Sequence, residues 1–244
     1  MKLKMLNNKK IAILGLGIEN LALIRYLLKH KIKAEITICD KREEVKNTGL
    51  RVKPAMTNAG PGMTKINWQL GKNYNKNLEK FEVLFRSPGW PITPLAPLVR
   101  GGVQLSSPMK MFFELCPTKN IIGVTGTKGK GTTASLIYEI LKAAGKRVWL
   151  GGNIGIAPFA FIGKIKQTDW VVLELSSFQL EDMAVSPHIA VITNLYSEHL
   201  APADPNNPNF HKSLKEYYNA KLNIIKLQTE DDKAVLNYEL RITN

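Results

Sequence analysis

The sequence predicts an α/β fold made of two successive units, each with a parallel sheet. Short apolar runs that suit buried strands alternate with stretches of helical periodicity along the chain. Two of the strand-to-helix turns are also rich in glycine, at residues 15–17 and at residues 126–131. Because parallel strands need a crossover between them, usually a helix, this alternation favours parallel pairing in both units.

The first unit is expected to begin with a strand and to end in a helical link. Its predicted elements are a buried strand at 10–14, a helix at 20–30, a strand at 34–39, a strand at 81–85 and a short helix at 109–115. Prolines punctuate residues 91–97, so any helix that follows them should be short.

The second unit is expected to start near Lys119. Its predicted elements are a strand at 120–122, a helix at 134–141, strands at 147–150, 170–173 and 189–195, a helix at 213–229 and a strand at 233–236. The intervening segment 196–211 carries three prolines, which predicts an irregular loop.

Composition narrows the class of protein. The chain has 244 residues and a formal net charge of +14. Its cations are mostly lysines scattered along the sequence, which is typical of a solvated surface and favours acidic small substrates over nucleic acid. No apolar stretch reaches the roughly 18–20 residues that span a bilayer. Cys39 and Cys116 form no spaced cluster, so neither a disulfide framework nor a zinc site is indicated, and we expect a cytoplasmic protein.

The segment GVTGTKGKGTT at residues 123–133 has the composition of a nucleotide-phosphate loop. Glycines allow backbone N–H groups to turn toward phosphates, and the positive end of the following helix faces the same charge. Lys130 is predicted to reach the terminal phosphates, and a threonine hydroxyl to bind Mg²⁺. Two residues depart from the general pattern, because Val124 replaces its first glycine and Gly131 follows the lysine where Ser or Thr is usual. The alternative is a glycine-rich turn that binds no ligand.

Three other polar residues attract attention in the second unit. Glu174 and His199 both follow predicted buried strands, so they should lie at the carboxyl edge of the sheet beside the phosphate loop. A carboxylate there can hold Mg²⁺, although a single Glu or His in a loop is often only solvated. Lys221 falls on an amphipathic helix, and its spacing alone indicates nothing beyond a solvated face.

The glycine-rich turn of the first unit reads GLGIEN at residues 15–20. It has the first two glycines of a dinucleotide fingerprint, but Asn20 stands in the place of the third. With Asp40 closing the next strand, the pattern is typical of a mononucleotide half-site and disfavours a redox cofactor.

Taken together, the motifs resemble the Mur ligase family. They are TGTKGKGTT in the phosphate loop, LGGNIG at 150–155, LELSSFQLE at 173–181, NLYSEHL at 194–200 and YYNAKLNIIKLQ at 217–228. The SSFQLE element is most similar to the branch of the family that adds D-glutamate to UDP-N-acetylmuramoyl-L-alanine in peptidoglycan synthesis. The resemblance covers essentially the whole chain.

The resemblance implies a Rossmann-like UDP-substrate domain at 1–116 and a P-loop ATPase-like central domain at 117–244. It assigns ATP to the phosphate loop, with Lys130 as a catalytic residue on the β- and γ-phosphates. The implied ATP-binding residues are Gly126, Thr127, Lys128, Gly129, Lys130, Gly131, Thr132 and Thr133. The residues implied to bind Mg²⁺ are Thr132 (with Thr133 as the alternative), Glu174, His199 and Lys221. Glu174, His199 and Lys221 are also implied to be catalytic.

Lys221 matches the family lysine that CO₂ carbamylates, so the resemblance replaces the solvated-face interpretation of this residue. The UDP-bearing substrate is expected to be bound by Leu16, Ile18, Asp40, Lys41, Arg42, Ser87, Pro88 and Gly89 in the first domain. The muramoyl-alanine end is expected to meet Asn153, Ser176 and Ser177. A monomer is expected, with no nucleic acid and no membrane insertion.

The implied reaction joins a carboxylate to an amine by way of an acyl phosphate. The L-alanyl carboxylate attacks the γ-phosphate of ATP, ADP leaves, and the D-glutamate amine then displaces phosphate. Lys130 and Mg²⁺ reduce the repulsion between the two anions that meet in the first step.

The sequence departs from the family pattern in some respects, and three other functions would also fit parts of it. The loop between His199 and Lys221 looks longer than in the family. The family also has a third domain, which binds the amino acid and is expected to be missing from this chain. The chain by itself should then ligate poorly. The rivals are a folylpolyglutamate synthase-like ligase, whose phosphate loop also reads GTKGKG, a non-catalytic nucleotide-binding fragment, and a basic nucleic-acid binder.

Overall fold

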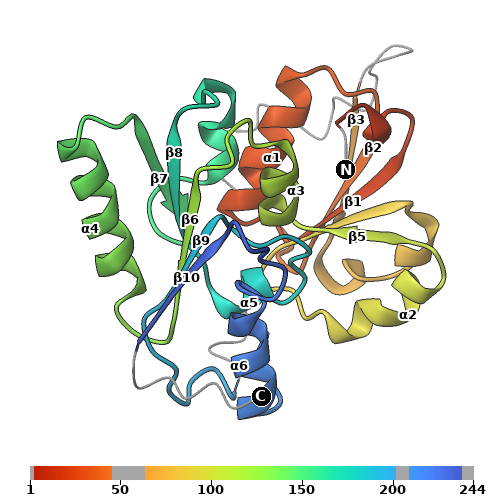
Figure 1. The fold of residues 1–244 in the computed structure, drawn as a ribbon. Helices are drawn as coiled ribbons and strands as arrows, with labels where there is room; N and C mark the ends of the chain where they lie inside the picture. The colour runs from red at the N-terminus through yellow and green to blue at the C-terminus, as the bar shows by residue number, and fades with distance from the viewer. Residues whose placement is uncertain (1–2, 46–63, 202–208, 238–244) are drawn as a thin grey trace. The chain divides into compact units, whose positions relative to one another are not determined.

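The computed structural model describes residues 3–45, 64–201 and 209–237, which form two compact units (Figure 1). One unit extends to Leu115 and the other begins at Cys116. Each unit is built around one parallel sheet, so the predicted α/β class is confirmed.

The first unit contains a five-stranded sheet with the strand order β3-β2-β1-β4-β5. All neighbouring strands in it pair in parallel. Its elements are β1 (Lys10–Leu14), α1 (Ile18–Lys29), β2 (Glu35–Asp40), β3 (Lys65–Leu70), β4 (Val83–Arg86), α2 (Ala96–Arg100), β5 (Gln104–Ser106) and α3 (Pro108–Leu115).

The centre of this sheet follows the apolar pattern, whereas its edges do not. β1 lies between β2 and β4, and the side chains from Ile11 to Leu14 are fully buried. The edge strand β3 reads KINWQL, and only Ile66 in it is buried. The other edge strand, β5, is three residues long. Because β3 is half solvated and β5 is short, the sequence pattern does not reveal either of them.

The second unit contains a five-stranded parallel sheet with the strand order β10-β9-β6-β8-β7. Its elements are β6 (Ile121–Thr125), α4 (Lys130–Ala143), β7 (Val148–Gly152), β8 (Trp170–Glu174), α5 (Ser177–Leu180), β9 (Ile189–Ile192), α6 (Leu214–Leu222) and β10 (Lys233–Leu236). In Figure 1, α4 runs along the part of the sheet formed by β6, β8 and β7, and it packs on these three strands.

The register of the second sheet brings three chain segments to one edge. Val124 of β6 pairs with Glu174 of β8, and Thr125 pairs with Ile192 of β9. All three strands run in the same direction, so the residues that follow them emerge side by side. This edge carries the phosphate loop, the segment after Glu174 and the segment after Ile192.

Two elements end earlier than the sequence predicts. β9 stops at Ile192, because the next two residues turn to bond the phosphate loop: Thr193 Oγ1 donates to the Lys128 carbonyl at 2.7 Å. α6 ends at Leu222 because Asn223 caps it, and the Asn223 side chain donates to the Leu180 carbonyl at 3.0 Å. Among the described residues, no helix is long and apolar enough to cross a membrane.

Gly152 offers a test of how tightly the sheet edge is packed. Its φ is 100°, and an added Cβ would collide with the main-chain oxygen of Glu174 and come within 3.0 Å of the Glu174 nitrogen. Gly155 has a similar φ of 77° but nothing within 4 Å of an added Cβ. We therefore expect Gly155→Ala to cost about 1–2 kcal/mol of unfolding free energy from backbone strain alone. Gly152→Ala should cost clearly more in urea titrations, and equal losses would contradict the predicted collision.

Candidate active site

The phosphate loop adopts the conformation that its glycines permit. β6 ends at Thr125 and α4 begins at Lys130. Gly126 has a φ of 142° and Gly129, which precedes the helix, has a φ of 78°. Both values lie in the region that residues with a Cβ rarely adopt, and a Cβ at Gly126 would also collide with the Thr193 hydroxyl. The loop thus directs its backbone around the positive end of α4.

The segment after β9 fixes the loop from one side. The Thr127 N–H donates to the Asn194 carbonyl at 2.9 Å, and the Lys128 N–H donates to the Asn194 side-chain oxygen at 2.8 Å. The Asn194 side-chain nitrogen returns a bond to the Lys128 carbonyl at 2.9 Å. These three bonds therefore tie the backbone of the loop to Asn194.

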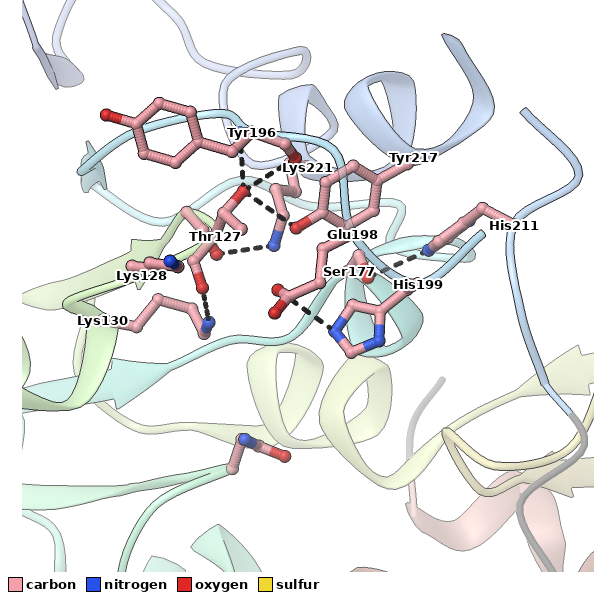
Figure 2. Close-up of polar contacts among 12 residues, drawn as sticks. Thr127, Lys128, Lys130, Ser177, Tyr196, Glu198, His199, His211, Tyr217 and Lys221 are labelled. Atoms are coloured by element: carbon pink, nitrogen blue, oxygen red, sulfur yellow. Dashed lines mark hydrogen bonds and ion pairs between the residues drawn. The ribbon is translucent and has the colours of Figure 1, made fainter. Parts of the chain in front are cut away.

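The Thr127 side chain connects the loop to two tyrosines (Figure 2). Its hydroxyl lies 3.0 Å from the Tyr217 hydroxyl, and the Tyr196 N–H donates to it at 2.9 Å. Tyr217 is fully buried on α6, and this burial raises the pKa of its phenol to about 12. Tyr217 therefore acts here as a neutral hydrogen-bonding group.

Lys130 is the first residue of α4 and is half-buried. Its ammonium donates to the Thr127 carbonyl at 2.8 Å, so the side chain folds back over the loop (Figure 2). This places a positive charge within the concave backbone, where a lysine of a phosphate loop meets terminal phosphates.

Gly131 occupies the helix position that faces Glu174. An added Cβ would lie 3.6 Å from Glu174 Oε2 and 3.0 Å from Ile154 Cδ1. The next residue, Thr132, is exposed, and Thr133 is half-buried. The absence of a side chain at Gly131 thus lets Ile154 and the Glu174 carboxylate lie close to the helix backbone, while the metal role of Thr132 stays a prediction.

Glu174 lies at the end of β8 and is 6% exposed. The Asn153 N–H donates to the Glu174 carbonyl at 2.8 Å, and the Asn153 side chain donates to Oε1 at 3.3 Å. The structure thus brings together two predicted site residues, with the carboxylate oriented by the turn after β7.

Lys221 is buried beneath the phosphate loop. Only 1% of the residue is exposed, and its Nζ donates to the Gly126 carbonyl at 2.7 Å. The Nζ also lies 4.8 Å from the centre of the Tyr217 ring. Burial, followed by repulsion from Lys130, lowers the pKa of the amine to about 7, although Glu198 and Glu174 oppose the shift. A large fraction of this amine is therefore neutral at physiological pH.

His199 sits in the segment after β9 with an unusual backbone. Its φ is 59°, in the left-handed region, which is uncommon for residues other than glycine, although histidine adopts it more often than most. Its ring lies 5.3 Å from the Phe178 ring and 5.9 Å from the Tyr217 ring, and Nε2 lies 3.6 Å from Glu198 Oε2. Burial lowers the His199 pKa, Glu198 opposes this shift, and Lys130 and the protonated form of Lys221 lower the pKa further. The neutral imidazole, the form that binds metal ions, is favoured.

The SSFQLE element forms a short helix with a reciprocal cap. Ser176 Oγ accepts a bond from the Gln179 N–H at 3.2 Å, and Gln179 Oε1 accepts one from the Ser176 N–H at 2.7 Å. Ser177 is 1% exposed, and its hydroxyl lies 2.9 Å from His211 Nε2. Both serines thus make bonds within the protein, and their contact with substrate stays a prediction.

The first unit gathers its predicted UDP-binding residues at the carboxyl edge of its own sheet. Asp40 accepts the Leu16 N–H at 2.7 Å and the Arg42 side chain at 2.8 Å, and Arg42 in turn donates to the Leu16 carbonyl at 2.9 Å. Burial raises the Asp40 pKa, but these bonds outweigh it, so the net pKa is lowered and the group stays ionised. An added Cβ at Gly15 would lie 2.5 Å from the Ser87 hydroxyl, so the turn and Ser87 are closely packed.

The remaining predicted residues of this first site are more open. Ile18 is 67% exposed at the start of α1, and Lys41 and Arg42 are also exposed. Pro88 and Gly89 follow β4 at the same edge and are half-buried. Their contact with a uridine nucleotide stays a prediction.

The donor groups near the phosphate loop fit a divalent cation only in part. Among the described residues, no group of three His, Cys, Asp or Glu side chains is close enough to hold a metal ion. Glu174 and His199 would therefore need another anionic ligand. Carbamylation of the neutral Lys221 amine would supply a carboxylate in this place, so the buried lysine makes the residues present compatible with Mg²⁺.

Residues 124–243 match the Mur ligase middle domain. This match covers the phosphate loop, Glu174, His199 and Lys221. The second unit thus matches the middle domain of Mur ligases over about half of the chain.

The relatives to which the chain is similar include two clostridial enzymes. It is 45% identical over 242 residues to the UDP-N-acetylmuramoylalanine–D-glutamate ligase of Acetivibrio thermocellus, covering 98% of this chain and 48% of the relative. It is 40% identical over 244 residues to the ligase of the same name from Clostridium acetobutylicum, covering 99% of this chain and 49% of the relative. The chain thus spans about half the length of the curated relatives it matches.

A solved structure shares the fold. It is the UDP-N-acetylmuramate:L-alanyl-gamma-D-glutamyl-meso-diaminopimelate ligase from Neisseria meningitides, with a TM-score of 0.55 and 16% identity, over 96% of this chain and 72% of that one. At this identity the likeness shows the fold alone.

Several residues of the site have no signal in the sequence pattern. Glu198, Tyr217 and His211 each line the neighbourhood of His199, yet none belongs to a periodic or spaced motif of its own. Glu198 and Tyr217 lie within motifs already noted, NLYSEHL and YYNAKLNIIKLQ, so closer attention to the polar residues of these motifs could have found them.

The lowered pKa of Lys221 predicts a dependence of stability on pH. Between pH 7 and the ordinary lysine value of 10.5, the unfolded chain keeps this proton and the folded chain has lost it, so stability rises with pH. Relative to Lys221→Met, wild type should gain up to about 1.4 kcal/mol per pH unit in CO₂-free buffer above pH 7, and the difference should level off below it. Urea unfolding at several pH values measures this, and a difference independent of pH would refute it.

Proposed function

We propose that this chain is part of an ATP-dependent ligase that joins D-glutamate to UDP-N-acetylmuramoyl-L-alanine in peptidoglycan synthesis. The single observation that carries the proposal is the buried Lys221 amine, with a pKa of about 7, bonded to the Gly126 carbonyl of a phosphate loop. A nucleotide-binding loop alone needs no such lysine. The 40–45% identity to ligases of that name across nearly the whole chain supports the choice of substrate.

The first step is the transfer of a phosphoryl group to the substrate. An oxygen of the L-alanyl carboxylate attacks the γ-phosphorus of ATP, the bond to the β–γ bridging oxygen breaks, and ADP leaves. Lys130 stabilises the negative charge that is shared by the transferring group and the leaving group. The loop N–H groups and the positive end of α4 act on the same phosphates.

The second step uses the acyl phosphate formed in the first. The D-glutamate amine attacks the carbonyl carbon, a proton is lost from nitrogen, and inorganic phosphate leaves to give the amide. Asn153, Ser176 and Ser177 are proposed to face the muramoyl-alanine end of the substrate. In the first unit, Leu16, Ile18, Asp40, Lys41, Arg42 and residues 87–89 are proposed to bind the UDP part.

Mg²⁺ is proposed to bind at Glu174, His199, Thr132 and carbamylated Lys221. The neutral lysine amine attacks CO₂ and releases one proton, which would convert a buried neutral amine into a carbamate with one negative charge. When bound, the ions neutralise phosphate oxygens and so make attack by a carboxylate possible. Lys221 is well suited to this modification because its burial favours the unprotonated amine.

Trapping of the acyl phosphate tests the proposed reaction. We expect the chain with MgATP, UDP-N-acetylmuramoyl-L-alanine and hydroxylamine to form the hydroxamate of the substrate and an equal amount of ADP, measured by mass spectrometry. Lys130→Ala should slow this by about a hundredfold or more, because one preorganised positive group is lost.

Lys142→Ala is the matched control, since Lys142 is exposed near the far end of α4. It should leave hydroxamate formation unchanged. Formation from a folate carboxylate instead of the UDP substrate would favour the folylpolyglutamate synthase-like alternative. No ADP from either substrate, despite ATP binding, would favour a non-catalytic nucleotide-binding fragment.

The threonine that serves the metal can be identified by substitution around Gly131. We expect Thr132→Val to weaken Mg²⁺-dependent ATP binding about tenfold, with a smaller effect of Thr133→Val. Gly131→Ser should restore binding in the Thr132→Val background. The side chain added at position 131 would point toward Glu174 after a small shift of Ile154, and it would supply the missing hydroxyl. Calorimetry with and without Mg²⁺ measures both effects. Unchanged binding in Thr132→Val would exclude Thr132 as the ligand.

A further inference from the structure

His211 is a fully buried histidine that the proposed mechanism does not use. It follows the segment that leaves the site at His199, and its N–H donates to the His199 carbonyl at 2.9 Å. This bond therefore joins the segment after β9 to the segment before α6.

The ring of His211 packs against two aromatic rings. It stacks on Phe178 with the ring centres 4.8 Å apart and an interplanar angle of 9°, and its centre lies 5.3 Å from the Tyr217 ring. Phe178 and Tyr217 are the same two rings that His199 contacts. His211 thus supports both aromatic surfaces against which His199 packs.

The polar edge of His211 connects this group to α5. Its Nε2 lies 2.9 Å from the Ser177 hydroxyl, and its Nδ1 lies 3.5 Å from Glu181 Oε1 (Ser177 and His211 in Figure 2). The imidazole therefore bridges the SSFQLE helix and the tyrosine of α6, while the backbone N–H of the same residue bonds the turn at His199.

The backbone of His199 explains why such a support is needed. Its φ of 59° is a strained conformation for a residue with a Cβ, and such conformations persist only when the surroundings determine them. We infer that His211 is a positioning residue, which holds His199 in the strained orientation from which its imidazole reaches the metal ion. This inference rests on the proposed metal role of His199.

The test is a comparison of metal affinity with metal-free nucleotide affinity. His211→Phe keeps an aromatic ring and the backbone bond, but removes the two polar contacts, with Ser177 and Glu181, that fix the orientation of the ring against Phe178 and Tyr217. We expect it to weaken Mn²⁺ binding to the ATP complex about tenfold to a hundredfold, measured by electron paramagnetic resonance in bicarbonate buffer. ATP affinity in EDTA should stay within twofold of wild type, which a general loss of structure would not allow.

His188→Phe is the matched control. His188 is half-buried before β9 and bonds Asp232 at 3.1 Å, on the opposite edge of the sheet from the phosphate loop. It should change neither affinity. If circular dichroism shows that His211→Phe does not fold, His211→Gln replaces it, since the amide can reach Ser177 while the ring is lost, and the same selective weakening is expected.

Three results would overturn the inference. They are Mn²⁺ affinity within twofold of wild type in the folded His211 variant, a parallel fall in metal-free ATP affinity, and an equal loss in His188→Phe. A wild-type chain that binds ATP but no Mn²⁺ would instead overturn the proposed metal site, and the inference with it. Failure of the inference alone is therefore distinguishable from failure of the proposed function.

Discussion

The hydrogen bond from the Lys221 amine to the Gly126 carbonyl is the contact on which the site depends. It joins α6 to the first residue of the phosphate loop, at a point where a lysine has almost no access to water. An ammonium group in such a place is unfavourable, and the pKa of about 7 expresses that penalty. Burial and Lys130 lower the pKa of the lysine, whereas Glu198 and Glu174 raise it. Together they keep the pKa close to physiological pH, where both protonation states are populated. A group of this kind is suited to chemical modification rather than to a permanent ion pair.

The second sheet provides the geometry for this contact. Its parallel register aligns the ends of β6, β8 and β9, so that three loops distant in sequence meet at one edge. The loops are then bonded to one another: Asn194 bonds the phosphate loop, Asn153 bonds Glu174, and Tyr217 bonds Thr127. The first unit repeats this principle separately, with Asp40 tying the turn at Leu16 to Arg42. In both units, side chains at the ends of parallel strands fix the glycine-rich turn.

Much of the fold could be predicted from the sequence, because buried parallel strands are continuous apolar runs. The buried strand at Lys10–Leu14 has the expected limits, and so does the exposed edge strand at Lys233–Leu236, while the polar edge strand β3 has no such run. The phosphate loop was recognisable because its glycines stand at conformations that demand them. Lys221 was not recognisable from its spacing, since burial of a lysine depends on tertiary packing rather than on helical periodicity. The reciprocal cap of Ser176 and Gln179 could have been expected from the spacing of a serine and a glutamine three residues apart.

The bonds that hold the phosphate loop also set the order in which the site can form. Its backbone is fixed by Asn194, its threonine by Tyr217 and its first carbonyl by Lys221, which lies 95 positions after Gly126. Contacts so distant in sequence form late, because the intervening chain must first be ordered. During synthesis, a ribosome that has released only β6 and α4 has made the glycine-rich segment but not a rigid cradle. A rigid loop therefore depends on α6 having emerged and docked, so that the loop becomes rigid only when the second unit folds.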